Sequence, residues 1–311
     1  MEFRNLGNSG LQVSVVGLGC NNFGMRMDQE ATTAVVGKAL DEGINLFDTA
    51  NSYGGGGKSE EMLGKALGPR RHEVVVATKF ASKMGEGPMQ SGGSRRHIIT
   101  MVEDSLRRLN TDYIDLYQVH FPDAKTPLEE TMRAMDDLVR QGKVRYIGHS
   151  NFAGWQATEA HYLAEKHHLT PFISAQNQYN MLQREIQAEL VPACRKFGVG
   201  VLPYFPLASG FLTGKYRPGQ PPPEGTRLAA WPIADRFLNE RNFEVLGKLE
   251  SFAEERGKTI LELAFAWLTS QDVVGSVIAG ATKIEQVESN VAAGEWRLTT
   301  EEMEEVNGLL K

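Results

Sequence analysis

The sequence predicts an α/β protein in which residues 1–311 form a single (β/α)8 TIM-barrel domain. Eight short apolar runs recur along the chain, and most are unbroken rather than alternating, which is typical of parallel strands buried on both faces. Successive runs start mostly about 30 residues apart, the length of one strand–helix–strand unit. The eight predicted strands are residues 13–18, 45–49, 74–79, 113–119, 144–149, 172–176, 199–204 and 274–279.

A doubly wound open sheet is the alternative fold for such a pattern. It usually carries the glycine pattern GxGxxG after its first strand, where phosphates approach the backbone. Here residues 17–22 read GLGCNN, so asparagine stands where the third glycine is required. We therefore favour the barrel.

Helical patterns separate the predicted strands, and two of them have recognisable starts. Asp28 is predicted to cap a helix that ends near Gly43. Residues 126–129 read TPLE, in which an N-cap threonine is followed by proline and by the glutamate of a capping box. We therefore expect another helix to begin here, with Thr126 as its N-cap.

Two segments depart from the strand–helix alternation. Residues 3–5 and 11–13 flank the turn-forming sequence GNSG and predict a β-hairpin that plugs the bottom of the barrel. Residues 217–232, before the last strand, are rich in proline and predict a long loop with no helix or strand of its own. Because compact folds seldom keep so long a loop without a purpose, we expect a lid or binding loop.

Composition narrows the class of protein. The formal net charge is −6, so no basic face for nucleic acid is expected. No run approaches ~18 apolar residues and the N-terminus lacks the apolar core of a secretory signal, so we expect no membrane span and a cytoplasmic location. The two cysteines cannot build a disulfide framework. The histidines other than those at 120 and 149 lack metal-ligand spacing, so no metal site is expected.

Four polar side chains stand at or just after the ends of three neighbouring predicted strands. Asp48 is at the end of the second strand and Tyr53 follows it, Lys79 ends the third and His120 stands at the end of the fourth. In a barrel these ends meet at the C-terminal face, where active sites lie. Singly, each has a structural explanation: a helix cap, a loop anchor, a solvated tip and a buried structural histidine. Their occurrence on adjacent strands favours one catalytic site.

This set of side chains suits the reduction of a carbonyl group to an alcohol. The oxygen gains negative charge as hydride reaches the carbon, and Tyr53 would supply the proton. Tyrosine is a weak acid at neutral pH, so the ammonium of Lys79 would lower its pKa, while Asp48 would keep Lys79 charged and oriented. His120 would donate a hydrogen bond to the carbonyl oxygen.

Several short motifs recur at a spacing that is characteristic of one family. They are FDTAxxYG at 47–54, SExxLG at 59–64, TK at 78–79, DLYQVH at 115–120, GKVR at 142–145 and GHSNF at 148–152. Together they resemble the signature of the aldo-keto reductase superfamily. The block LTGKY at 212–216 resembles the branch of bacterial general aldo/keto reductases and potassium-channel beta subunits. The resemblance implies Asp48, Tyr53, Lys79 and His120 as the catalytic tetrad, with NADPH extended across the barrel mouth beneath the long loop.

The resemblance also implies which residues bind this cofactor. Ser150, Asn151 and Gln176 would hold the carboxamide, and Tyr204 would stack on the nicotinamide ring. The loop after the seventh strand would line the pyrophosphate. The implied cofactor contacts are Gly19, Cys20, Asn21, Asp48, Ser150, Asn151, Gln176, Tyr204, Phe205, Pro206, Leu207, Ala208, Gly210, Lys215, Arg227, Gly280, Thr282, Lys283, Gln286 and Asn290.

The segment after the eighth strand is a candidate phosphate site on its residues alone. Residues 280–286 read GATKIEQ and predict a helix N-terminus with hydroxyl and ammonium groups beside it. In barrels the loops after strands seven and eight often bind phosphate. The resemblance assigns Thr282, Gln286 and Asn290 to the 2′-phosphate and adenine of NADPH, whereas Lys283 is equally consistent with a solvated lysine. Ser289 departs from the glutamate that many relatives carry.

Apolar residues near the strand ends predict a pocket for a small-molecule substrate, an aldehyde or a ketone. They are Phe23, Met25, Phe80, Phe121 and Trp231, each of which could instead contact the core or the cofactor.

Two other functions fit parts of the pattern. A Schiff-base aldolase would use Lys79 as its amine but leaves residues 150–151 and 280–286 unexplained. A non-catalytic nicotinamide-binding regulatory subunit, like the channel beta subunits, would carry an N-terminal extension, whereas this sequence begins directly at the predicted hairpin. We therefore expect an enzyme.

Overall fold

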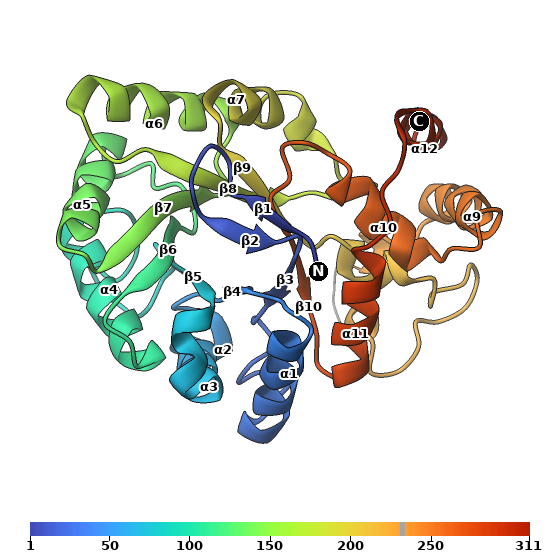
Figure 1. Cartoon of the computed structure of the whole chain (residues 1–311), viewed down its shortest axis with the longest axis horizontal. Coiled ribbons are helices and arrows are strands. Elements are labelled where there is room, and N and C mark those ends of the chain that lie inside the picture. Colours follow the sequence, from blue (N-terminus) through green and yellow to red (C-terminus); the bar gives the residue numbers. More distant parts are fainter. Residues whose placement is uncertain (231–233) are drawn as a thin grey trace.

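A computed structural model describes residues 1–230 and 234–311 of the chain. Eight parallel strands form its centre, in the order β10-β3-β4-β5-β6-β7-β8-β9 (Figure 1). Backbone hydrogen bonds close the ring between β9 and the segment before β10, where Val201 N donates to Val273 O at 2.8 Å and Gly275 N donates to Val201 O at 3.0 Å. The strands are β3 (Val16–Gly19), β4 (Leu46–Asp48), β5 (Val75–Phe80), β6 (Ile114–Val119), β7 (Val144–Ser150), β8 (Phe172–Gln178), β9 (Gly200–Tyr204) and β10 (Val277–Gly280).

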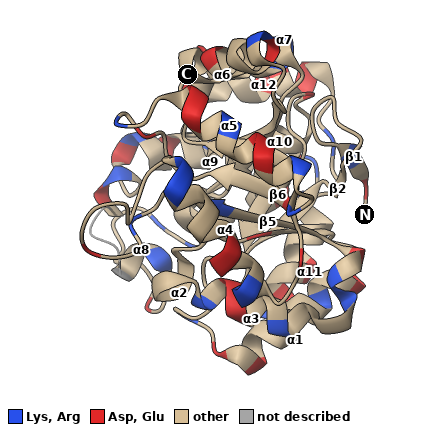
Figure 2. Ribbon diagram, turned by 90° about the vertical axis from the view of Figure 1, so that its left-hand side faces the viewer, with Lys and Arg blue, Asp and Glu red and all other residues tan. Residues whose placement is uncertain are grey.

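Each barrel strand falls within or overlaps one predicted apolar run, so the (β/α)8 prediction is confirmed and the open sheet is wrong. Helices encircle the strands in Figure 1, and Figure 2 shows acidic and basic residues interspersed over the outer helices. None of the helices in the described ranges is long and apolar enough to span a bilayer. The helices are α1 (Gln29–Asp41), α2 (Tyr53–Gly56), α3 (Lys58–Leu67), α4 (Arg95–Leu109), α5 (Leu128–Arg140), α6 (Gly154–His167), α7 (Leu190–Phe197), α8 (Arg227–Ala230), α9 (Glu240–Glu254), α10 (Ile260–Thr269), α11 (Ile284–Ala293) and α12 (Thr300–Leu309).

The helix starts follow the sequence in one case and depart from it in another. Asp28 caps α1 as predicted, since its carboxylate accepts a hydrogen bond from Ala31 N at 2.9 Å. The predicted capping box of α5 is wrong, because α5 begins at Leu128 and has no side-chain cap. Thr126 Oγ1 instead donates to Asp123 Oδ2 at 2.7 Å, so the hydroxyl serves the turn before the helix.

The N-terminal hairpin closes the bottom of the barrel, as predicted. Its strands β1 (Phe3–Asn5) and β2 (Gln12–Ser14) pair antiparallel. Leu6, fully buried at the turn, packs into the apolar layer at the base of the barrel. Gly7 has φ 57°, and a Cβ there would lie 2.3 Å from Gly198 O, so this close approach requires glycine.

The long loop before β10 is irregular over residues 214–226 and then forms α8. The expectation that 217–232 contains no helix is therefore wrong. The reason is the position of the prolines: the last one before α8 is Pro223, so the residues that follow keep the backbone N–H groups that a helical turn needs. Trp231 and the rest of the segment up to 233 lie outside the described residues.

Candidate active site

A cavity of about 900 Å³ opens at the C-terminal ends of the barrel strands. Residues at or just after the ends of seven strands line it: Gly19, Asp48, His120, Ser150, Gln176, Tyr204 and Gly280. The loop between η3 (Ala208–Thr213) and α8 contributes one wall. This is the face of a barrel on which active sites occur.

The four predicted catalytic residues lie together at this cavity. Lys79 Nζ is 2.7 Å from Asp48 Oδ2 and donates a second hydrogen bond to Thr49 O at 2.8 Å. The same ammonium lies 5.1 Å from the centroid of the Tyr53 ring. The rings of Tyr53 and His120 meet edge to face, with centroids 5.7 Å apart. Asp48, Tyr53 and His120 line the cavity, whereas Lys79 is fully buried behind them.

Neighbouring residues fix the orientation of these side chains. Asp48 Oδ1 accepts a hydrogen bond from Gln176 Nε2 at 2.8 Å, so both carboxylate oxygens are engaged. Tyr53 begins the short helix α2, and the next residue, Gly54, has φ 70°. A Cβ at Gly54 would lie 2.8 Å from Phe23 O, so glycine allows the turn to pack closely beneath the tyrosine.

Burial and charge set the protonation of the tetrad. Burial raises the pKa of Tyr53; the Lys79 ammonium opposes this rise, yet the pKa stays above its ordinary value. The expected acidifying effect of Lys79 is therefore present but is outweighed by burial. Burial also acts to lower the pKa of Lys79, but the Asp48 carboxylate raises it, so the amine is an ammonium. Burial, with a further contribution from Lys79, lowers the pKa of His120 to about 3, so the imidazole is neutral at pH 7.

One side of the cavity carries amide and hydroxyl groups that brace each other. Asn151, at φ 61°, donates from Nδ2 to His120 O at 2.9 Å. Its Oδ1 accepts a hydrogen bond from the Tyr204 hydroxyl at 2.8 Å. Ser150 Oγ donates to Gln176 O at 2.8 Å. These contacts hold the Tyr204 ring and the three predicted carboxamide ligands in one rigid group.

Another part of the cavity lining carries cations. Lys215 and Arg227, both predicted, line the cavity together with Arg26. Burial, followed by repulsion from neighbouring cations, lowers the pKa of Lys215 and also that of Arg227, and Arg26 contributes to both shifts. Arg26 is not among the residues predicted from the sequence, although its position in the loop after β3 was the available signal. The hydroxyl of Ser209, buried in this wall, has no hydrogen-bond partner in the described part of the chain.

The predicted phosphate segment also borders the cavity. Thr282, Lys283, Gln286 and Asn290 all line it, and α11 begins at Ile284 as expected. Gln286 Oε1 accepts hydrogen bonds from the backbone N of Thr282 at 2.7 Å and from its hydroxyl at 3.2 Å. Of the remaining predicted cofactor residues, Ala208 is fully buried and outside the lining. Those that do line it are Gly19, Cys20, Asn21, Phe205, Pro206, Leu207, Gly210 and Gly280.

The predicted substrate pocket needs correction. Phe121 does line the cavity and stacks on His120 with ring centroids 4.4 Å apart. Phe23 and Phe80 do not line the cavity, because both are fully buried in the large hydrophobic core. Met25 is 72% exposed and also lies outside the lining. Trp231 is not among the described residues.

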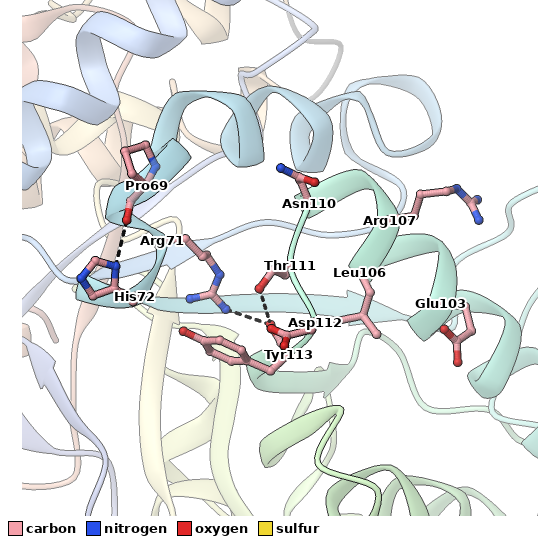
Figure 3. A pocket seen from close by; sticks show the side chains of 10 residues that line it. All are labelled: Pro69, Arg71, His72, Glu103, Leu106, Arg107, Asn110, Thr111, Asp112 and Tyr113. Carbon is pink, nitrogen blue, oxygen red and sulfur yellow. Dashed lines mark hydrogen bonds between the residues drawn. The ribbon is translucent and has the colours of Figure 1, made fainter.

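A second hollow, of about 750 Å³, lies at the other end of the barrel, beside the start of β6 (Figure 3). Several of its polar groups already have partners: Arg71 pairs with Asp115 behind the lining at 2.7 Å, Thr111 Oγ1 donates to Tyr113 O at 3.2 Å, and His72 Nδ1 lies 2.8 Å from a backbone carbonyl. Such a position in a barrel is associated with stability rather than catalysis. The candidate active site is therefore the cavity at the C-terminal face.

Comparison with known proteins identifies the family. The model described as "Aldo/keto reductase family" matches residues 15–311. A "Probable voltage-gated potassium channel subunit beta" of Arabidopsis thaliana is 38% identical over 301 residues, which cover 94% of this chain and 91% of the relative. "Uncharacterized oxidoreductase YrpG" of Bacillus subtilis (strain 168) is 38% identical over 323 residues, covering 99% and 96%. "L-glyceraldehyde 3-phosphate reductase" of Escherichia coli (strain K12) is 35% identical over 305 residues, covering 94% and 87%. With the barrel and its cavity both inside the matched range, the chain belongs to the aldo/keto reductase family and is an oxidoreductase.

Proposed function

We propose that this protein is an NADPH-dependent reductase that converts an aldehyde or a ketone to the alcohol, with Tyr53 as the proton donor. The observation that carries the proposal is the arrangement at the cavity floor. There, the buried ion pair of Lys79 and Asp48 lies behind Tyr53, and a neutral His120 lies beside it.

Each member of the tetrad has one role in this reaction. When bound, the reduced nicotinamide supplies a hydride to the carbonyl carbon. The Tyr53 hydroxyl gives its proton to the carbonyl oxygen, and the ammonium of Lys79 stabilises the phenolate that remains. His120 holds the oxygen by donating a hydrogen bond, and Asp48 keeps Lys79 protonated. The phenolate regains a proton from water before the next turnover.

The cavity residues fit a dinucleotide phosphate. Lys215, Arg227 and Arg26 gather on one wall although they repel one another, which favours binding of an anion between them. The unpartnered Ser209 hydroxyl in the same wall is a further donor for such a group. Ser150, Asn151 and Gln176 would hold the carboxamide against Tyr204, and Thr282, Lys283, Gln286 and Asn290 would hold the adenosine 2′-phosphate.

The state of Lys79 disfavours the Schiff-base alternative. Attack on a carbonyl requires a neutral amine, and enzymes obtain it by lowering the pKa of the lysine. Here Asp48 raises the pKa of Lys79 despite the burial that acts to lower it. The side chain is also fully buried and does not line the cavity. Borohydride trapping with a ketose would therefore give no adduct, and an adduct at Lys79 would support the aldolase.

The proposal is tested with the Tyr53→Phe variant, which loses only the phenolic hydroxyl. With an aldehyde panel followed by NADPH absorbance, we expect kcat/KM to fall roughly 10²–10⁴-fold while the Kd for NADPH stays within a few-fold. Tyr162→Phe, on the exposed side of α6, is the matched control and should leave kcat/KM unchanged. Near wild-type reduction by Tyr53→Phe would show that another group donates the proton. A wild-type protein that binds NADPH but turns over none of the carbonyl compounds would favour the regulatory subunit.

A further inference from the structure

The hydrogen-bond partner of His120 lies outside the tetrad. Ser82 Oγ is 3.0 Å from His120 Nδ1. A neutral imidazole carries its proton on one ring nitrogen only, and the partner of the other nitrogen decides which. Because Nδ1 is engaged by Ser82 and the ring lines the cavity, Nε2 is the nitrogen left for a bound carbonyl oxygen.

A second serine gives this contact a direction. Ser52 Oγ donates to Ser82 Oγ at 3.3 Å, so the Ser82 oxygen already accepts a proton. Across residues 1–230 and 234–311, these two contacts are the side-chain hydrogen bonds of Ser82. With Ser52 as the donor to its oxygen, the Ser82 hydroxyl has its own proton available for His120 Nδ1, and an Nδ1 that accepts this proton leaves the proton of the imidazole on Nε2.

The backbone before Ser82 is held in an unfavourable conformation. Ala81 has φ 81°, in the left-handed region that residues with a Cβ rarely adopt. Gly92 N donates to Ala81 O at 2.9 Å, and His120 N donates to Phe80 O at 3.0 Å, so both sides of the turn are tied down. Strained backbone conformations persist where many surrounding contacts hold them in place, and they cluster at functional sites. Here this conformation turns the chain after β5 so that Ser82 faces the end of β6.

We propose that Ser82 is a positioning residue that, with Ser52 behind it, keeps His120 in the tautomer protonated at Nε2. The inference rests on the proposed carbonyl reduction, since only this tautomer donates a hydrogen bond to the carbonyl oxygen. The other tautomer would present a lone pair to an oxygen that is gaining negative charge, and would raise the barrier. Ser52 also precedes Tyr53, so one short hydrogen-bonded chain links the segment of the proton donor to the group that holds the substrate oxygen.

Nuclear magnetic resonance of protein labelled with [15N]histidine tests the tautomer directly. Long-range proton–nitrogen correlations distinguish the protonated from the unprotonated ring nitrogen, and His120→Gln assigns the signal among the seven histidines. We expect the Nε2-protonated form in the wild type and in Ser82→Thr, which keeps the hydroxyl. Ser82→Ala should show a mixture of the two tautomers or mainly the Nδ1-protonated form. A wild-type ring protonated at Nδ1, or a tautomer unchanged in Ser82→Ala, would overturn the proposal.

Kinetics provide the second readout. In Ser82→Ala we expect kcat for an aldehyde to fall about 3- to 10-fold, the size of one neutral hydrogen bond, while the KM for NADPH is unchanged. Ser82→Thr should restore kcat. Lys83→Ala, which alters the exposed neighbouring side chain, should match the wild type. A loss of kcat in Ser82→Ala that Thr does not rescue would also count against positioning. Absence of carbonyl reduction by the wild type would refute the proposed function, while the tautomer measurement would still decide the role of Ser82.

Discussion

Three buried ionisable side chains in the barrel differ in charge because their partners differ. Lys79 keeps its proton because the Asp48 carboxylate lies 2.7 Å away and more than offsets burial. His120 has no carboxylate partner among the residues that the structure describes, and burial together with Lys79 lowers its pKa to about 3. His149 is packed against the rings of Phe152 and Phe172, and burial alone lowers its pKa to about 3. The charge of each group is thus decided by whether a carboxylate offsets the effect of burial, as Asp48 does for Lys79.

His149 makes stability depend on pH in a predictable direction. In the unfolded chain histidine titrates near ~6.5, whereas the native ring stays neutral down to a pKa of about 3. Between these values the unfolded state binds more protons, so the free energy of unfolding falls as the pH decreases. When the pH is lowered from 7 to 5, the free energy of unfolding should decrease in both proteins. We expect this decrease to be about 2 kcal/mol smaller in His149→Leu than in the wild type.

Urea denaturation at the two pH values measures this difference. His72→Leu, which alters an exposed histidine of η1 (Gly68–Glu73), is the control and should retain the wild-type pH dependence. Identical pH dependence in the wild type and His149→Leu would contradict the prediction.

At the scale of elements, the turn before α11 is predicted to favour binding of NADPH over NADH. Thr282 and Lys283 line the cavity where the adenosine end of NADPH would lie. One charge-assisted hydrogen bond to a 2′-phosphate corresponds to roughly 10- to 100-fold in affinity, so we expect NADPH to bind that much more tightly than NADH. Lys283→Gln should reduce this ratio without changing the Kd for NADH.

Fluorescence titration with both cofactors gives the two Kd values. Lys65→Gln, which removes a cation of α3 outside the cavity lining, serves as the control and should keep the ratio. Equal affinity of the wild type for NADPH and NADH would refute the assignment.

The loop between η3 and α8 is the element predicted to cover the cofactor. It is fixed at one end by the ion pair of Arg217 with Glu250 at 3.1 Å, and Glu224, Gly225 and Arg227 line the cavity at the other end. Because proline removes backbone donors from its middle, few hydrogen bonds of its own hold it. We expect bound NADPH to protect it by contacts with Arg227.

Limited trypsin digestion, read by mass spectrometry, tests this protection. Cleavage after Arg227 should slow at saturating NADPH, while cleavage at lysines outside the cavity should proceed at an unchanged rate. The lid hypothesis fails if cleavage within residues 217–230 is indifferent to the cofactor.

At the scale of the whole molecule, the N-terminal hairpin is predicted to contribute to stability but not to catalysis, because it lies at the end of the barrel opposite the cavity. Leu6 is fully buried at the base of the barrel. A Cβ at Gly200 or at Gly275 would lie only 2.7 Å from Leu6 Cδ1, so glycine at these two positions makes space for the leucine side chain. We predict that Leu6→Ala lowers the free energy of unfolding by about 2–5 kcal/mol, because it opens a cavity in the lower layer. The kcat should remain near the wild-type value, since the catalytic cavity lies at the other end.

Chemical denaturation measures the loss, and Met25→Ala, at a largely exposed methionine, should change stability by about 0.5 kcal/mol or less. A Leu6→Ala protein as stable as the wild type would show that the hairpin does not contribute to closing the barrel.

Much of the candidate site could be predicted because the C-terminal ends of successive strands lie side by side on one face of a barrel. Asp48, Lys79 and His120 were found at the ends of successive apolar runs, and parallel strands bring those ends to one face. Thr126 failed as an N-cap because α5 begins at Leu128, which puts Pro127 at the cap position and leaves the Thr126 hydroxyl to donate to Asp123 in the preceding turn. Phe23 and Phe80 failed as pocket residues because both are packed into the core, and whether a side chain near a strand end faces the core or the cavity depends on tertiary packing.

The sequence by itself determined the eight strands and the hairpin and predicted the four residues of the proposed tetrad, because period, spacing and strand ends are local properties of the chain. Only the tertiary structure decided the charge of these residues, since the pKa of Tyr53 depends on how burial weighs against Lys79. The tertiary structure also places Arg26 in the cavity lining with Lys215 and Arg227. It likewise places Ser82 within hydrogen-bond distance of His120. Such contacts join segments far apart in the chain, and their strength depends on distance and burial, which follow from how the whole barrel packs.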